Sequence, residues 1–127
     1  MAPQIQLAFI LLIVFQVKHF ICDFPLQSDW MVHFKTAAGW KFVWPLSAHC
    51  LIHAGATLCI LLWWSPHLWW LTGVDFIAHF LMDRFKSSPN FLGRYSDRTR
   101  HAFWSALGFD QMVHHLTSFY IVWEMIR

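Results

Sequence analysis

Histidine and aspartate residues occur in pairs whose members are four residues apart. The pairs lie in the segments HFICD, HCLIH, HFLMD and DQMVH, and they comprise His19 with Asp23, His49 with His53, His79 with Asp83, and Asp110 with His114. Residues at this spacing lie on one face of an α-helix, one turn apart. Because imidazole nitrogens and carboxylate oxygens are ligands of transition metals, each pair predicts two neighbouring metal ligands.

A single pair has a structural alternative, since a lone histidine or aspartate in an apolar helix often hydrogen-bonds to a neighbouring helix. The recurrence of the pairing in four separate segments favours a shared metal site. With Asp75, these segments hold four carboxylates, and buried carboxylates must be paired, neutralised or bound to metal. We expect one or two divalent metal ions, with zinc as the first choice and manganese or iron as alternatives.

Asp75 and Lys86 are the candidate catalytic residues outside the pairs. Asp75 precedes His79 by one turn and is a candidate general base. Lys86 follows Asp83 by about one turn, where it either pairs with that carboxylate or orients an anionic phosphate group together with a neighbouring arginine. The glutamines Gln27 and Gln111 are candidate hydrogen-bond partners of the ligands, and no role is assigned to the unpaired histidines His33, His67, His101 and His115.

The composition indicates that lipid surrounds the segments that carry these residues. The chain has 127 residues, of which 57% are hydrophobic and 13% charged, and it contains nine tryptophans. Soluble domains average about 25% charged residues, so this composition excludes a disordered chain and argues against an ordinary soluble enzyme. The net charge of +2 does not suggest nucleic acid as a partner. The length fits one domain over residues 1–127.

Four segments have the length and apolar character of membrane-spanning helices, at about residues 5–24, 42–64, 67–86 and 99–125. We therefore expect an all-α fold, a four-helix transmembrane bundle. A short interfacial helix over residues 30–35, capped by Ser28 or Asp29, is expected after the first span. Ser96 or Asp97 is expected to cap the last helix. Because the last two spans are less hydrophobic, a soluble helical bundle is the alternative.

Basic residues predict the orientation in the membrane. Seven lie in or beside the loops after the first and third spans, and Arg127 alone lies on the other side; the seven are Lys35, Lys41, Arg84, Lys86, Arg94, Arg98 and Arg100. Positive charge collects on the cytoplasmic side. This predicts a multi-pass protein of the inner (cytoplasmic) membrane with both long loops in the cytoplasm and both termini outside.

This topology predicts that the four pairs lie at similar depths. With a rise of about 1.5 Å per residue, His19 lies roughly 7 Å from the cytoplasmic end of its span. His49 and His79 lie roughly 10 Å from it, and Asp110 roughly 15 Å. All four pairs are therefore expected in the cytoplasmic half of the bilayer, where one site can include them.

The same residues carry a resemblance to a known family. The segments HFICDFPLQSDW, HCLIH, HFLMDRFK and DQMVH resemble DUF3307, a domain of unknown function found in small bacterial and phage membrane proteins. The resemblance covers almost the whole chain, and H-x-x-x-D-F-x-L-Q is its most specific part. It implies a membrane protein and no established activity. The family pattern falls on His19, Asp23, Phe24, Leu26, Gln27, Lys35, His49, His53, His79, Asp83, Lys86, Asp110, Gln111 and His114, with Asp75 at a place where an acidic residue is expected.

The first functional hypothesis is a membrane-embedded, metal-dependent hydrolase, in which metal activates water and polarises a phosphoryl or acyl oxygen. A loose similarity to membrane-bound metal-dependent hydrolases with His/Asp helices agrees with it. The expected substrate is a lipid or another phosphate-containing molecule at the cytoplasmic face, and the expected partners are the lipid bilayer and an anionic lipid. The alternatives are a non-catalytic scaffold clamped by metal, including a homo-oligomer, and an ion or proton pathway.

Overall fold

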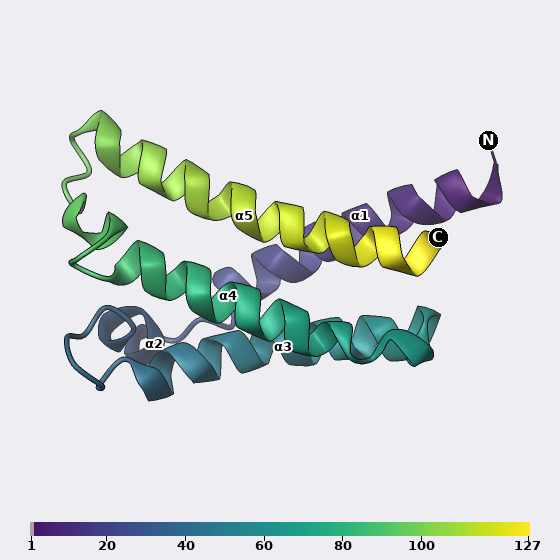
Figure 1. The fold of residues 1–127 in the computed structure, drawn as a ribbon, viewed down its shortest axis with the longest axis horizontal. Coiled ribbons are helices and arrows are strands. Elements are labelled where there is room, and N and C mark those ends of the chain that lie inside the picture. Colours follow the sequence, from purple (N-terminus) through teal and green to yellow (C-terminus); the bar gives the residue numbers. More distant parts are fainter. Residues whose placement is uncertain (1) are drawn as a thin grey trace.

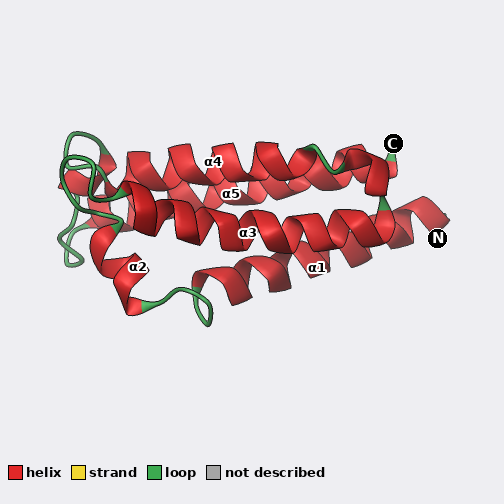
Figure 2. Cartoon of the chain, turned by 90° about the horizontal axis from the view of Figure 1, so that it is seen from below, coloured by secondary structure: helices red, strands yellow, loops and turns green. Residues whose placement is uncertain are grey.

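The computed structural model describes residues 2–127, which form four long helices lying side by side (Figures 1 and 2). These are α1 (Pro3–Asp23), α3 (Val43–Trp64), α4 (Leu71–Ser87) and α5 (His101–Ile126). A short helix, α2 (Asp29–Phe34), follows α1, and two 3-10 turns, η1 (Pro66–Leu68) and η2 (Leu92–Arg94), lie in the connections. The described residues contain no strand, so the expected all-α fold is confirmed.

Local sequence explains where several helices begin and end. Pro3 occupies the first position of α1, where a proline costs no hydrogen bond. The helix ends at Asp23, because Pro25 has no amide hydrogen with which to continue the helical hydrogen bonds. Ser28 caps α2 as predicted, since its hydroxyl accepts a hydrogen bond from the Met31 amide at 3.4 Å.

The predicted cap of the last helix is wrong. Helix α5 begins at His101, and Arg100 precedes it without a side-chain cap. Asp97 instead accepts hydrogen bonds from the amide of Thr99 at 3.0 Å and from its hydroxyl at 2.6 Å. These bonds hold the pKa of Asp97 below its usual value. An aspartate that bonds to its own turn in this way is not available to the helix that follows.

The inside of the bundle is divided along its length into an apolar half and a polar half. Leu11, Phe15, Leu61, Leu71 and Ile121 are fully buried and form the apolar core. They come from the parts of the four helices nearest the chain termini, which lie together at one end of the molecule (Figure 1). The long loops lie at the opposite end, and the histidine and aspartate pairs are buried toward them.

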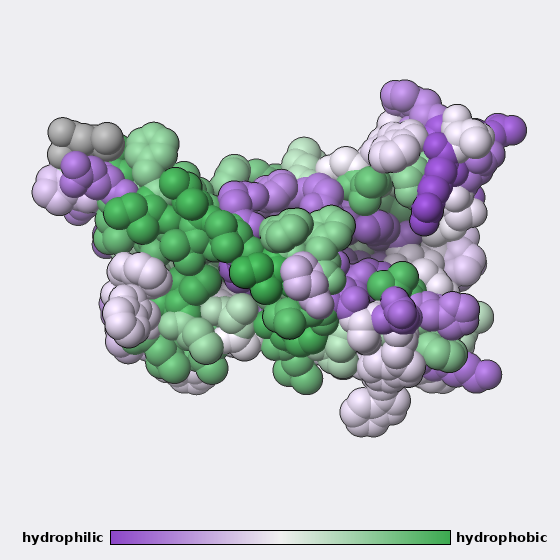
Figure 3. All heavy atoms as spheres, turned by 180° about the vertical axis from the view of Figure 1, so that it is seen from behind, coloured by the Kyte–Doolittle hydropathy of each residue, from purple (hydrophilic) through white to green (hydrophobic). Residues whose placement is uncertain are grey.

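Two helices, α1 and α3, are long and apolar enough to cross a membrane, with 21 and 22 residues. Helix α4 is shorter than the predicted third span, because Pro66–Leu68 forms a separate 3-10 turn before it. Large apolar side chains on the outer surfaces of α4 and α5 are exposed, among them Ile77, Leu81, Leu116 and Phe119. Figure 3 shows an extensive apolar surface on the side of α1 as well.

A close backbone approach holds the η2 turn against the end of α4. The Gly93 amide donates a hydrogen bond to the Ser88 carbonyl at 3.0 Å. A Cβ atom at Gly93 would lie 2.5 Å from the Ser87 carbonyl oxygen, which is too close for any side chain. Glycine is therefore required here by contact with neighbouring backbone.

We expect Gly93→Ala to displace the η2 turn and loosen the exposed basic loop that follows. Forced overpacking typically costs about 1–3 kcal/mol, and we expect trypsin to cleave the loop several times faster than in the unmodified protein. Gly55→Ala is the matched control, because a Cβ at Gly55 would meet no atom within 4 Å. Equal cleavage rates for Gly93→Ala and Gly55→Ala would contradict the assigned role of Gly93.

Candidate metal centre

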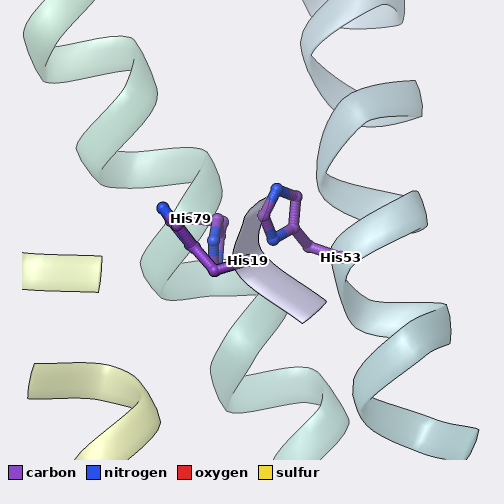
Figure 4. Close-up of side chains that lie close together, drawn as sticks. All are labelled: His19, His53 and His79. Carbon is purple, nitrogen blue, oxygen red and sulfur yellow. The ribbon is translucent and has the colours of Figure 1, made fainter. Parts of the chain in front are cut away.

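The four predicted pairs converge inside the polar half of the bundle. All of their side chains point inward, and seven of the eight residues are buried, Asp23 being half-buried. Figure 4 shows the imidazoles of His19, His53 and His79 gathered between helices α1, α3 and α4. The ring centroid of His79 lies 4.1 Å from that of His53 and 4.3 Å from that of His114 on α5. The histidine and aspartate pairs of all four helices therefore meet at one centre.

On the α1–α3 side, the carboxylate of Asp23 faces three imidazoles. Its Oδ1 atom lies 2.8 Å from His53 Nε2 and 3.4 Å from His49 Nε2. Its Oδ2 atom lies 3.0 Å from His19 Nε2. One carboxylate therefore connects the histidines of two helices.

On the α4–α5 side, two carboxylates face one imidazole. His114 Nε2 lies 3.0 Å from Asp83 Oδ1 and 3.1 Å from Asp110 Oδ1. The second oxygen of Asp83 lies 3.3 Å from His49 Nε2 but has no hydrogen bond with it. His49 therefore lies between Asp23 and Asp83 and links the two sides of the cluster.

Three sets of side chains bring ligand atoms close enough to share an ion. The sets are His19, His53 and His79; Asp23, His49 and His53; and Asp83, Asp110 and His114, each with ligand atoms within 4.8 Å of one another. Ligands about 2.1 Å from a tetrahedral metal are roughly 3.4 Å apart. Modest side-chain adjustment would thus bring each set to coordination distance.

The tautomer of His79 follows from its contact with Asp75. His79 Nδ1 lies 3.1 Å from the main-chain carbonyl of Asp75 and 3.0 Å from its Oδ1 atom. Because a carbonyl oxygen only accepts hydrogen bonds, Nδ1 donates, and in the neutral ring the lone pair is on Nε2. Nε2 is buried and has no hydrogen bond. Metal-binding histidines commonly hold their other ring N–H in this way.

Asp75 is held by two further groups. Lys18 Nζ donates to Asp75 Oδ2 at 2.9 Å, and the Thr57 hydroxyl donates to the same oxygen at 2.6 Å. The side chains of Lys18 and Asp75 are 4% and 1% exposed. These contacts favour a role for Asp75 in orienting His79, whereas its assignment as a general base stays a prediction.

Lys86 pairs with a carboxylate of the cluster, but not with the expected one. Its ammonium donates to Asp110 Oδ2 at 2.9 Å and so connects α4 to α5. Asp83, which is the nearer carboxylate in the sequence, instead contacts His114 and His49. The Lys86 side chain is 32% exposed, so this residue extends from the centre to the surface of the protein.

The two glutamines differ in their relation to the centre. Gln111 lies beside it as expected, with Oε1 at 3.1 Å from His19 Nε2 and Nε2 donating to Asp110 at 3.0 Å. Gln27 contacts none of the eight ligands by a hydrogen bond and instead accepts one from Lys35 at 3.3 Å. Its predicted place beside the ligands is therefore not found, because it follows the end of α1 and faces the loop region.

Three residues beside the centre were not predicted from the sequence, namely Lys18, Thr57 and His115. His115, which was assigned no role, has its ring 5.3 Å from that of His19 and a hydrogen bond with Gln16 at 3.2 Å. A signal for Lys18 was present, because a lysine within an apolar helix needs an acidic partner. The partner could not be read from the sequence, since Asp75 is 57 positions away.

The fold and the site define a class of all-helical protein whose four long helices enclose a buried cluster of histidine and aspartate. The chain belongs to the DUF3307 family, described as a protein of unknown function, whose family model matches residues 10–127. The match covers nearly the whole chain and all eight candidate ligands, which confirms the resemblance noted from the motifs. Comparisons with curated proteins and with solved structures gave no match.

Proposed function

We propose that this chain is an integral membrane metalloprotein that hydrolyses a lipid- or phosphate-containing substrate at the cytoplasmic face. The main support for a metal site is the state of the His79 ring. Its Nδ1 atom is held by Asp75, and its Nε2 atom is buried without a hydrogen bond. A buried nitrogen lone pair without a partner is costly unless it binds something. The other ligand groups surround it on three helices.

Charge balance supports a divalent cation. The buried cluster holds four carboxylates, and the ammonium groups of Lys18 and Lys86 pair with two of them, Asp75 and Asp110. With neutral imidazoles, Asp23 and Asp83 leave a charge of −2. Buried charge of this kind must be compensated, and one divalent ion compensates it. Zinc is our first choice because nitrogen and oxygen ligands dominate the cluster, and manganese and iron are the alternatives.

We propose that all four long helices cross the membrane, and not α1 and α3 alone. Helix α4 has 17 residues and is about 25 Å long, close to the roughly 30 Å thickness of the hydrocarbon layer. The exposed apolar residues of α4 and α5 would contact lipid in this arrangement. The excess of basic residues in the long loops supports an orientation with the loops in the cytoplasm and both termini outside the inner membrane.

A metal held by these ligands would supply Lewis-acid chemistry, activating water and polarising a phosphoryl or acyl oxygen. Hydrolysis would transfer the hydroxyl of that water to the phosphorus or the carbonyl carbon and its proton to the departing ester oxygen. Lys86 is suited to orient an anionic group, because its ammonium lies at the cluster, in contact with Asp110, and its side chain is 32% exposed. Asp75 would fix the orientation of His79 from behind.

The deep burial of the cluster favours a second candidate, a metal-clamped scaffold without catalytic activity. His49, His53 and His79 are at most 1% exposed, and structural metal sites are closed whereas catalytic sites keep an open position. A water ligand on the bound metal would favour the hydrolase, and a fully protein-coordinated metal would favour the scaffold. The apolar core near the termini argues against an ion pathway through the bundle.

The metal content of the purified protein tests the shared basis of both candidates. We expect at least one zinc, manganese or iron ion per chain by elemental analysis after purification without chelators. The double variant His49→Ala, His79→Ala removes buried ligands from two helices, and we expect it to lose the metal.

The control is the double variant His67→Ala, His101→Ala, which removes two histidines that belong to none of the three ligand sets. It should keep the full metal content. Metal-free unmodified protein, or equal metal content in the two double variants, would overturn the metal site.

A further inference from the structure

A basic pocket lies at the loop end of the bundle, next to the candidate metal centre. It has a volume of about 410 Å³ and is enclosed by α2, the end of α4, the η2 turn and the beginning of α5. Its lining includes two lysines, Lys35 and Lys86, and the hydroxyl-bearing side chains Thr36, Ser87, Tyr95 and Ser96. The pocket therefore combines positive charge and hydroxyl groups with apolar side chains, among them Val32, Leu92 and Phe103.

Both lysines can donate further hydrogen bonds. An ammonium group has three N–H donors, and Lys86 donates one of them to Asp110 Oδ2. Lys35 donates to the neutral amide oxygen of Gln27 at 3.3 Å, and this contact does not cancel its charge. Among residues 2–127, no carboxylate lies within ion-pair distance of Lys35.

The walls of the pocket are held in place before any ligand arrives. Gly93, which lines it, is fixed against the end of α4 by its contacts with Ser87 and Ser88. On the other side, Arg84 of α4 donates to the Ala37 carbonyl at 3.3 Å and thereby ties the segment after α2 to α4. A preformed site avoids the cost of ordering loops on binding.

We propose that this pocket binds a phosphate group, with Lys35 and Lys86 as its cationic contacts and the surrounding hydroxyls as further donors. Charge-assisted hydrogen bonds to phosphate are the strong ones, and lysine is a common phosphate ligand. Lys86 contacts both the pocket and Asp110, so the phosphate would lie beside the metal centre. The inference rests on the proposed function only in taking the phosphate to be part of the substrate. Phosphate binding itself can be measured without turnover.

The test compares the unmodified chain in detergent with three variants, using two probes. Inorganic phosphate is titrated by calorimetry, and phosphatidic acid is presented in nanodiscs against a phosphatidylcholine background. We expect Lys35→Gln to weaken binding of one or both probes about ten-fold or more. Lys41→Gln removes the same charge from the same loop at an exposed residue outside the pocket, and it should bind as the unmodified protein does. Lys35→Arg keeps the positive charge and should therefore bind more tightly than Lys35→Gln, which would show that residue 35 can be changed without unfolding the pocket.

The two probes distinguish the source of the phosphate. Binding of inorganic phosphate shows that the pocket recognises the phosphate group of a soluble molecule, whereas binding of phosphatidic acid alone indicates a lipid headgroup. Equal weakening by Lys35→Gln and Lys41→Gln would overturn the pocket, as would a failure of the unmodified chain to bind both probes. Metal content is measured on the same samples. If the unmodified protein contains no metal, and Lys35→Gln still loses phosphate binding while Lys41→Gln keeps it, the result would support the pocket and reject the proposed function.

Discussion

Asp83→Asn is expected to remove the metal from the protein and, with it, any hydrolytic activity. Asparagine keeps the size of the side chain but lacks the negative charge that faces both His114 and His49. Loss of a group that only supports a ligand typically lowers metal affinity 10–100-fold. Because Asp83 belongs to a ligand set itself, we expect a loss of about 100-fold or more. Competition with a chromophoric chelator measures this change.

Asp97→Asn is the matched control for Asp83→Asn, because it makes the same chemical change in an exposed loop. Its metal affinity should equal that of the unmodified protein. Helix content by circular dichroism verifies that Asp83→Asn remains folded. Retention of full metal affinity by a folded Asp83→Asn protein would show that Asp83 is not a ligand.

Lys18→Met is expected to cause the largest loss of stability. Lys18 and Asp75 form a buried ion pair at 2.9 Å, and removal of the lysine leaves a buried carboxylate whose remaining polar side-chain contacts, among residues 2–127, are Thr57 and His79. Breaking such a pair by removing one partner costs about 3–5 kcal/mol. The free energy of unfolding in detergent, followed by circular dichroism, measures the loss.

The double variant Lys18→Met, Asp75→Asn distinguishes the ion pair from simple packing. It removes both charges together, so it should recover part of the stability that the single variant loses. Lys41→Met is the control, because it makes the same change at an exposed lysine, and it should leave the free energy of unfolding unchanged. An unchanged free energy of unfolding in Lys18→Met would contradict the importance of the pair. Asp75→Asn alone should also weaken metal binding 10–100-fold, if Asp75 orients His79.

Features set by neighbouring residues could be predicted from the sequence. The four-residue spacing places both members of each pair on one helix face, so the convergence of His19, His53, His79 and His114 needed only four helices packed together. The α2 cap at Ser28 is equally local. The cap of α5 was mispredicted because Asp97 has a local alternative, the turn with Thr99, and the sequence does not show which hydrogen bond is better.

Features set by packing between helices could not be predicted. Lys86 contacts Asp110 on the neighbouring helix and not Asp83 on its own, and this choice depends on how α4 and α5 are rotated against each other. The burial of Lys18 against Asp75 depends in the same way on the approach of α1 to α4. The proposed phosphate pocket is also of this kind, since its walls bring residues 32–36 together with residues 86–107, which are distant in the sequence.

In a membrane, the division of the bundle into two halves would also decide where the electrical potential drops. The apolar core around Leu11, Leu61 and Ile121 would act as the insulating layer, while the polar half would be close to the potential of the cytoplasm. Moving one charge through a full potential of 100 mV involves about 2.3 kcal/mol. A cation that reaches the cluster from the loop end would cross only a small part of that potential. The centre could then exchange its ion with the cytoplasm almost independently of the membrane voltage.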